Sequence, residues 1–292
     1  MQSLKYWIEA ARLKTLPASL SPVLLGSSIA YFDTHLDVRA LFYCLFFALL
    51  CQIGTNFSND YLDAKKGADT KQRVGPRRLV ASGILKPQAM FKAAISTLAL
   101  AFFVGLNLLP FGGYWLLAIG ITSLIFAWCY TGGPYPLAYN ALGDVFVILF
   151  FGLIAVSMSY YVQTQSFTAL VFLNAFACGL YINTLLLINN IRDYEEDSKH
   201  NKRTTIVLLG IPFGLKLYNF SLVSVLLVAL INSINSYSLY HFLVLIPLLI
   251  SLQVGRQLNK AKTQNTFDSL LKKTGIAVLL YGILASIGFI LS

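Results

Sequence analysis

The chain has little charge for its length and few of the side chains that usually bind transition metals. Only 12% of its 292 residues are charged, and it contains three histidines and four cysteines. The histidines are scattered and no two cysteines form a CxxC pair, so we expect neither a histidine or cysteine metal site nor a haem. All four cysteines lie within apolar runs, where such residues act as small buried hydrophobic groups.

Long apolar runs take the place of charge. The mean hydropathy is +0.69, and apolar stretches near 20 residues recur along the whole chain. Each is long enough to cross a bilayer core of about 30 Å, and too long for a barrel strand. We therefore predict an all-α, multi-pass membrane protein with a single domain over 1–292. It would have an interfacial helix over 3–14 and nine transmembrane helices at 16–32, 39–57, 88–109, 112–130, 142–162, 167–189, 213–232, 238–255 and 274–291.

The basic residues support this arrangement of spans. With nine spans, 21 of the 22 lysines and arginines fall on the side of the N-terminus, and only Arg39 falls on the other. The positive-inside rule then places the N-terminus and the loops after spans 2, 4, 6 and 8 in the cytoplasm, with the C-terminus opposite. The net charge of +10 is explained by contact with anionic lipid headgroups, not by nucleic-acid binding.

The few carboxylates are concentrated in two places on the cytoplasmic side. Seven of the twelve lie just after the second and sixth predicted spans, although carboxylates are costly near a bilayer unless something compensates them. These seven are Asp60, Asp63, Asp69, Asp193, Glu195, Glu196 and Asp197. Two such clusters at one membrane face suggest a shared task.

Each cluster continues a polar stripe along a predicted helix. The first acidic stripe, at spacings i, i+3, i+4 and i+7, comprises Asn56, Asn59, Asp60 and Asp63. The second acidic stripe, at i, i+4 and i+8, comprises Asn189, Asp193 and Asp197. Each set shares one helix face, so facing stripes would offer the hard oxygen ligands that Mg²⁺ prefers. The alternative interpretation is that these are ordinary helix-capping or solvated loop residues. A metal site is favoured because both stripes lie on the same side of the membrane and at the same helical phase.

Basic residues flank both stripes. A metal ion together with arginine and lysine is the combination that a diphosphate needs as ligand and as leaving group. The positive-inside rule alone would also place some cations here. The predicted diphosphate-binding residues are Asn59, Lys65, Arg73, Arg78, Lys202 and Arg203.

A third segment, 130–139, is cytoplasmic yet carries no charge. Its two glycines and two prolines predict a defined non-helical loop. Its tyrosines, Tyr130, Tyr135 and Tyr139, could line an aromatic pocket and stabilise a carbocation, or form an interfacial aromatic belt. Asp144 opens the next apolar span. An intramembrane carboxylate is a functional candidate, although a helix N-terminal acid is also consistent.

These motifs resemble those of a known family. Asn56-x-x-Asn59-Asp60-Tyr61-x-Asp63 and Asn190-x-Arg192-Asp193-x-Glu195-x-Asp197 are similar to the two acidic motifs of the UbiA superfamily of intramembrane prenyltransferases. Arg12-x-Lys14-Thr15-Leu16-Pro17-Ala18, Arg73-x-Gly75-Pro76-x-Arg78 and the 130–139 loop resemble the branch that prenylates 1,4-dihydroxy-2-naphthoate in menaquinone synthesis. Asp144 departs from the pattern, because many relatives are expected to have glutamate there.

The resemblance implies a UbiA-like helical bundle and a reaction. Mg²⁺ would hold a polyprenyl diphosphate, the allylic C–O bond would ionise, and the aromatic ring would attack the cation. Carbon dioxide would then leave the substituted carbon, giving a demethylmenaquinone at a bacterial inner membrane. The implied metal ligands are Asn56, Asp60, Asp63, Asp193 and Asp197, with the four aspartates catalytic. The implied acceptor and prenyl pocket comprises Arg12, Tyr130, Tyr135, Tyr139, Asp144 and Asn189.

Other functions remain open on the sequence alone. Within the superfamily, 4-hydroxybenzoate, homogentisate or a tetrapyrrole could be the acceptor instead. A membrane transporter is the main alternative from another class, but its ion sites would be expected near the bilayer midplane. A non-catalytic lipid-binding scaffold would not explain two acidic stripes in phase.

Overall fold

The computed structural model describes residues 4–67 and 77–292, which form helices joined by short loops. The first half contains α1 (Leu4–Ala11), η1 (Leu13–Thr15), α2 (Pro17–Asp33), α3 (Val38–Lys65), α4 (Pro87–Leu106), α5 (Leu109–Gly112), α6 (Leu116–Cys129) and η2 (Leu137–Tyr139). The rest contains α7 (Gly143–Val147), η3 (Ile148–Ile154), α8 (Ala155–Thr164), α9 (Ala169–Arg192), α10 (Tyr194–Lys199), α11 (Thr205–Leu209), α12 (Ile211–Ser236), η4 (Leu239–Val244), α13 (Leu245–Leu258) and α14 (Gln264–Ile290).

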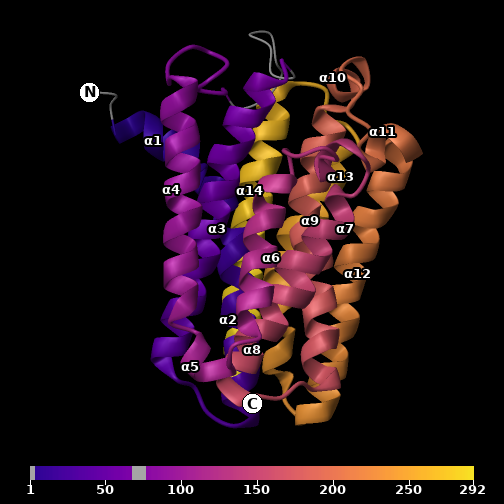
Figure 1. The fold of residues 1–292 in the computed structure, drawn as a ribbon. Coiled ribbons are helices and arrows are strands. Elements are labelled where there is room, and N and C mark those ends of the chain that lie inside the picture. Colours follow the sequence, from indigo (N-terminus) through magenta and orange to yellow (C-terminus); the bar gives the residue numbers. More distant parts are fainter. Residues whose placement is uncertain (1–3, 68–76) are drawn as a thin grey trace.

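The long helices stand side by side as one bundle. Helices α1 and α10 lie at one end of it, and α5 and the C-terminus lie at the other (Figure 1). Within the described residues the chain has no β-strand, and one isolated bridge pairs Asn140 with Arg203. The predicted all-α, multi-pass membrane class is confirmed.

Seven helices within the described residues are long and apolar enough to cross a membrane: 38–65, 87–106, 143–164, 169–192, 211–236, 239–258 and 264–290. The other two predicted spans correspond to α2, with 17 residues, and α6, with 14 residues. A helix rises about 1.5 Å per residue, so α6 alone would cover only about 21 Å of a bilayer core. The count of nine spans therefore stays a prediction.

The predicted interfacial helix is divided near its end. α1 stops at Ala11, and Arg12 adopts a left-handed conformation with φ of 51° before the short η1 begins. This break turns the chain from α1 into α2, which packs against α14, α8 and α3.

The most buried long helix, α9, occupies the middle of the core. Within an apolar stretch of 18 residues of this helix, 78% of the residues are buried inside the protein. The helix packs against η3, α12 and α14. Two glycines make the contact with η3 possible, because a Cβ on Gly152 would lie 2.5 Å from the Ala175 carbonyl oxygen and 2.7 Å from the Gly179 Cα. Direct backbone contact through small residues is a common device between membrane helices. It fixes the segment from α7 to α8 against α9.

Candidate active site

A polar cavity of about 650 Å³ lies where the acidic ends of α3 and α9 approach each other. Both acidic stripes contribute to its wall, as do the α1–η1 turn and the loop around Tyr139. Of the predicted site residues, it is lined by Arg12, Asn56, Asn59, Asp63, Arg78, Tyr130, Tyr139, Asp144, Asn189, Asp193 and Lys202. The structure thus brings together side chains that are far apart in the sequence.

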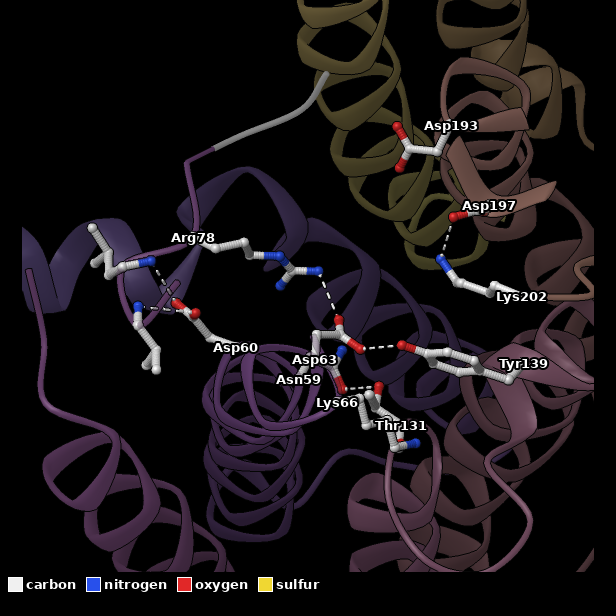
Figure 2. Close-up of polar contacts among 12 residues, drawn as sticks. Asn59, Asp60, Asp63, Lys66, Arg78, Thr131, Tyr139, Asp193, Asp197 and Lys202 are labelled. Carbon is white, nitrogen blue, oxygen red and sulfur yellow. Dashed lines mark hydrogen bonds and ion pairs between the residues drawn. The ribbon is translucent and has the colours of Figure 1, made fainter. Parts of the chain in front are cut away.

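Asp63 is the carboxylate of the first stripe that faces this cavity. It accepts a hydrogen bond of 2.8 Å from the Tyr139 hydroxyl and one of 3.0 Å from Arg78 Nη2 (Figure 2). The Asp63 side chain is 13% exposed and that of Arg78 is 10% exposed, so water screens this ion pair only weakly. A carboxylate and a guanidinium therefore stand side by side on the cavity wall.

Asp60 is directed elsewhere. It is buried, and its two carboxylate oxygens accept hydrogen bonds from the backbone N–H groups of Leu79 and Val80, at 3.2 and 3.3 Å (Figure 2). It does not line the polar cavity. Because Leu79 directly follows Arg78, these bonds fix the turn that presents the Arg78 guanidinium to Asp63.

The two asparagines of the first stripe hold neighbouring segments. Asn56 donates to the Ala11 carbonyl at 2.9 Å and to Thr15 Oγ1 at 3.0 Å, which ties α3 to the turn that carries Arg12. Asn59 Oδ1 accepts a hydrogen bond of 2.6 Å from the Thr131 hydroxyl. Both side chains also contribute to the cavity wall.

The second stripe is not continuous. Asp193 is the residue between α9 and α10, so Asp193 and Asp197 lie on different helices. Arg192 binds the Asp193 carboxylate through Nε at 2.6 Å and Nη2 at 2.9 Å, and both side chains are buried. Asp197 accepts a hydrogen bond of 3.1 Å from Lys202 and does not line the cavity (Figure 2).

The ring of Tyr139 lies near two lysines, one that follows the first stripe and one that follows the second. Lys66 Nζ lies 4.5 Å from the centre of its ring and Lys202 Nζ lies 5.8 Å from it. Lys66 also donates to the Thr131 carbonyl, and partial burial lowers the pKa of its ammonium group. The sequence pattern favoured Lys65 and did not single out Lys66 or Arg192. Both lysines are exposed and outside the cavity lining, but Lys66 contacts the 130–139 loop, and Arg192 lines the cavity. In the sequence, Lys66 and Arg192 look like the other basic residues around them. Only the direction in which each side chain points in the folded protein distinguishes them.

Three further predicted residues lie apart from the cavity wall or outside the described residues. Tyr135 is 59% exposed. Arg203 is exposed, although its backbone N–H donates to the Tyr139 carbonyl at 3.1 Å. Arg73 lies outside the residues that the structure describes.

A second cavity, of about 200 Å³ and almost wholly apolar, adjoins the polar one. The two share lining residues on α3, at the end of α6 and on the segment from α7 to η3, and each contains Gln52, Thr55, Tyr130, Val147 and Phe151. A ligand with a charged head and a long apolar tail would suit this pair of cavities.

The donor atoms around the polar cavity fit Mg²⁺ bound to a phosphate group. Asn59, Asp63 and Asp193 supply hard oxygen atoms to its wall. Within the described residues no three histidine, cysteine or carboxylate side chains gather closely enough to hold an ion by themselves. Mg²⁺ commonly uses one or two carboxylates and completes its shell with water and substrate phosphate oxygens, which suits two carboxylates across an open cavity.

The fold and the two cavities define a class: a multi-pass helical membrane protein with a polar site at one end of the bundle that leads to an apolar site. The profile of the UbiA prenyltransferase family matches residues 19–286. The chain belongs to that family.

Relatives of known name cover nearly the whole chain. The 1,4-dihydroxy-2-naphthoate octaprenyltransferase of Escherichia coli is 33% identical, covering 98% of this chain and 95% of its own length. The protein of the same name from Bacillus subtilis is 29% identical, with 97% and 92% covered. The mouse UbiA prenyltransferase domain-containing protein 1 is 32% identical, with 98% and 84% covered.

Solved structures share the fold. A UbiA homologue from Archaeoglobus fulgidus bound to GPP and Mg²⁺ superposes with a TM-score of 0.66 at 15% identity, covering 98% of this chain and 99% of that one. An apo UbiA homologue from Aeropyrum pernix K1 superposes with a TM-score of 0.69 at 15% identity, covering 96% and 98%. The predicted UbiA-like bundle is thereby confirmed.

Proposed function

We propose that this chain transfers a polyprenyl group from a polyprenyl diphosphate to 1,4-dihydroxy-2-naphthoate, with loss of diphosphate and carbon dioxide. The observation that carries the proposal is the placement of Asp63, Arg78 and Asp193 around one polar cavity that adjoins an apolar one. The names of the relatives support the naphthoate acceptor and the prenyl donor.

The polar cavity would bind the diphosphate head. Asn59, Asp63 and Asp193 are the side chains that would hold Mg²⁺. The bound ion would neutralise the negative charge that develops on the departing diphosphate. Arg78 would bind a diphosphate oxygen directly, since a guanidinium donates several hydrogen bonds in a fixed fork. Arg12, Arg192 and Lys202 add positive charge around the same cavity. Asp60 would act by holding the turn that carries Arg78.

The apolar cavity would bind the first part of the prenyl chain. Its shared wall with the polar cavity includes Tyr130, whose ring would lie beside the allylic carbon of a donor that spans both cavities. An aromatic face stabilises an adjacent cation, and the apolar walls keep water from that cation. The remaining length of the tail would pass between helices into lipid.

The orientation of the protein in its membrane is part of the same proposal. The excess of lysine and arginine on the side of α1 and α10 supports a cytoplasmic position for this end, in the inner membrane of a bacterium. Helix α1 and the C-terminus lie at opposite ends of the bundle (Figure 1), so the C-terminus would be on the opposite side. Water-soluble dihydroxynaphthoate would then enter from the cytoplasm.

The test is an acceptor panel on the purified protein in liposomes. With Mg²⁺ and geranylgeranyl diphosphate, the protein should convert 1,4-dihydroxy-2-naphthoate to a prenylated product that lacks the carboxyl group, with equimolar release of diphosphate. The panel should include 4-hydroxybenzoate and homogentisate, and mass spectrometry identifies the product. Turnover of one of those acceptors in preference to the naphthoate would refute the proposed acceptor. No Mg²⁺-dependent diphosphate release with any acceptor would refute the proposed reaction.

A further inference from the structure

Asp144 is a buried carboxylate whose second oxygen atom has no protein partner within the described residues. The residue is 5% exposed and lies in the first turn of α7, on the wall of the polar cavity. Its Oδ1 accepts a hydrogen bond of 2.9 Å from Asn183 Nδ2. Its Oδ2 is buried and accepts no hydrogen bond from the described parts of the chain.

The protein holds this carboxylate in a fixed position. Asn183 is fully buried on α9, and the glycine contact between η3 and α9 fixes the helix segment on which Asp144 lies. A buried polar atom without a partner calls for an explanation, because nearly all such atoms in folded proteins are bonded. Burial of an ionisable group at membrane depth is costly and usually marks a functional position.

The neighbours of Asp144 place it near Tyr130, where the two cavities adjoin. A Cβ built on the adjacent Gly143 would lie 3.3 Å from the Tyr130 hydroxyl, so Tyr130 and the start of α7 are in direct contact. Tyr130 belongs to both cavities. The carboxylate is therefore next to the passage between the polar and the apolar site.

Besides Asp144, the polar cavity is lined by the carboxylates Glu9, Asp63, Asp193 and Asp268. Glu9 is bonded to Arg77, and Asp268 is only half-buried, whereas Asp144 is 5% exposed. Asp63 is bonded to Arg78 and Tyr139, Asp193 is bonded to Arg192, and Asp60 is bonded to backbone N–H groups away from the cavity. A general base needs a free lone pair within hydrogen-bond reach of the proton that it removes. Asp144 differs from these three aspartates because it lines the cavity and one of its oxygen atoms, the buried Oδ2, accepts no hydrogen bond from the described residues.

We infer that Asp144 is the catalytic base that accepts the proton of the acceptor's hydroxyl group, with Asn183 as the residue that positions it. The inference rests on the proposed function. The hydroxyl at C1 of 1,4-dihydroxy-2-naphthoate is adjacent to the carbon that carries the carboxylate, so its ionisation drives electron density onto that carbon.

Atoms and electrons balance across the step. The C1 hydroxyl proton moves to Asp144 Oδ2 while C2 forms a bond to the allylic carbon, whose bond to the diphosphate oxygen breaks with its electron pair leaving on diphosphate. C1 becomes a ketone next to a quaternary carbon that bears the carboxylate. Loss of carbon dioxide returns an electron pair to the C1 oxygen, which takes the proton back from Asp144. The base is thus regenerated, and no oxidant or reductant is needed.

The primary test compares Asp144→Asn with the wild type in liposomes. Asparagine keeps the size and polarity of the side chain but cannot take the proton. General-base catalysis typically contributes about 10²- to 10⁴-fold, so kcat should fall within that range while the KM for the prenyl diphosphate changes less than threefold. Asp33→Asn, which removes a carboxylate bonded to Tyr160 outside both cavities, is the matched control and should keep full activity.

Chemical rescue separates a catalytic from a structural role. Asp144→Ala should regain turnover, by tenfold or more, when formate is added to replace the missing carboxylate. Asn183→Leu should shift the acidic limb of the pH profile of kcat without changing the donor KM.

Two results would overturn the assignment: Asp144→Asn with kcat within threefold of the wild type, or Asp144→Ala that is folded and inactive and shows no response to formate. If Asp144→Asn does not fold, the formate experiment on Asp144→Ala decides. A wild-type protein that does not prenylate the naphthoate would refute the proposed function instead.

Discussion

The first acidic stripe lies on one uninterrupted helix, α3, whereas the second is divided at Asp193 between α9 and α10. On α3 the cation that neutralises the cavity-facing carboxylate, Arg78, comes from a separate turn. On α9 it comes from the adjacent residue, Arg192. Similar sequence patterns therefore reach one cavity through different local structures.

The difference shows how each stripe divides its carboxylates between binding and structure. On α3, Asp63 faces the cavity and Asp60 holds a turn through two backbone N–H groups. In the second stripe, Asp193 faces the cavity and Asp197 holds Lys202. Each stripe therefore presents one carboxylate to the cavity and uses the other to position a cationic segment. Substitutions in the two stripes can test this division.

The largest effect is expected for the two cavity-facing carboxylates. Asp63→Asn and Asp193→Asn should each lower kcat by about 10²- to 10³-fold, because each removes a charge that would hold the metal–diphosphate complex. Each should also raise the Mg²⁺ concentration for half-maximal turnover. Steady-state kinetics over a Mg²⁺ series measures both. Near-normal activity in one variant would mean that its stripe does not serve the reaction.

Arg78 should contribute mainly to donor binding. A hydrogen bond to a charged group contributes about 1.5–3 kcal/mol, so Arg78→Ala should raise the KM for the prenyl diphosphate by roughly 10- to 100-fold. Arg78→Lys keeps the charge and should recover part of that loss. Donor titrations at saturating acceptor provide the measurement, and a donor KM unchanged in Arg78→Ala would remove this residue from the site.

Asp60 should behave differently from Asp63. Asp60→Asn leaves only one side-chain oxygen for two backbone N–H groups, so it should lower the free energy of unfolding by about 1–3 kcal/mol. It should raise the donor KM modestly by loosening the Arg78 turn, and leave the half-maximal Mg²⁺ concentration unchanged. Thermal unfolding in detergent measures the loss of stability, and kinetics over a Mg²⁺ series measures the half-maximal Mg²⁺ concentration. A shift in Mg²⁺ dependence as large as that of Asp63→Asn would make Asp60 a metal ligand after all.

Two of the three tyrosines of the 130–139 loop, Tyr139 and Tyr135, form a matched pair with the smallest expected effects. Tyr139→Phe removes the hydroxyl that donates to Asp63 and should lower kcat/KM about threefold to tenfold, corresponding to a net hydrogen bond of about 1 kcal/mol. Tyr135→Phe changes an exposed residue outside the cavity and should leave kcat/KM unaltered. Equal effects of the two changes would contradict the role given to Tyr139.

The sequence predicted the membrane class and the meeting of the two stripes well, because both follow from long-range patterns of hydrophobicity and helical phase. It placed Asp60 on the shared face because a spacing of i+4 from Asn56 is correct for a helix. It could not show that the turn at Leu79 and Val80 would capture that carboxylate. The break at Asp193 was also missed, since no glycine or proline marks it.

The choice between neighbouring cations was the least predictable feature. Lys65 and Lys66 are adjacent and identical, yet only Lys66 reaches Thr131 and the ring of Tyr139. Their directions depend on where α3 ends relative to the 130–139 loop, which is a matter of tertiary packing. The hydrogen bond from Asn183 to Asp144 likewise depends on tertiary packing, because it requires the close approach of η3 to α9 at Gly152 and Gly179.

The central claim is that both stripes form a single site for a metal-bound diphosphate. The most direct measurement is the binding of Mn²⁺, as a spectroscopic substitute for Mg²⁺, to the purified protein with and without a non-hydrolysable prenyl thiodiphosphate, followed by electron paramagnetic resonance. The analogue should strongly increase Mn²⁺ binding to the wild type, and Asp63→Asn and Asp193→Asn should each abolish that increase. An increase that survives in both variants, or that depends on one stripe alone, would contradict the shared site.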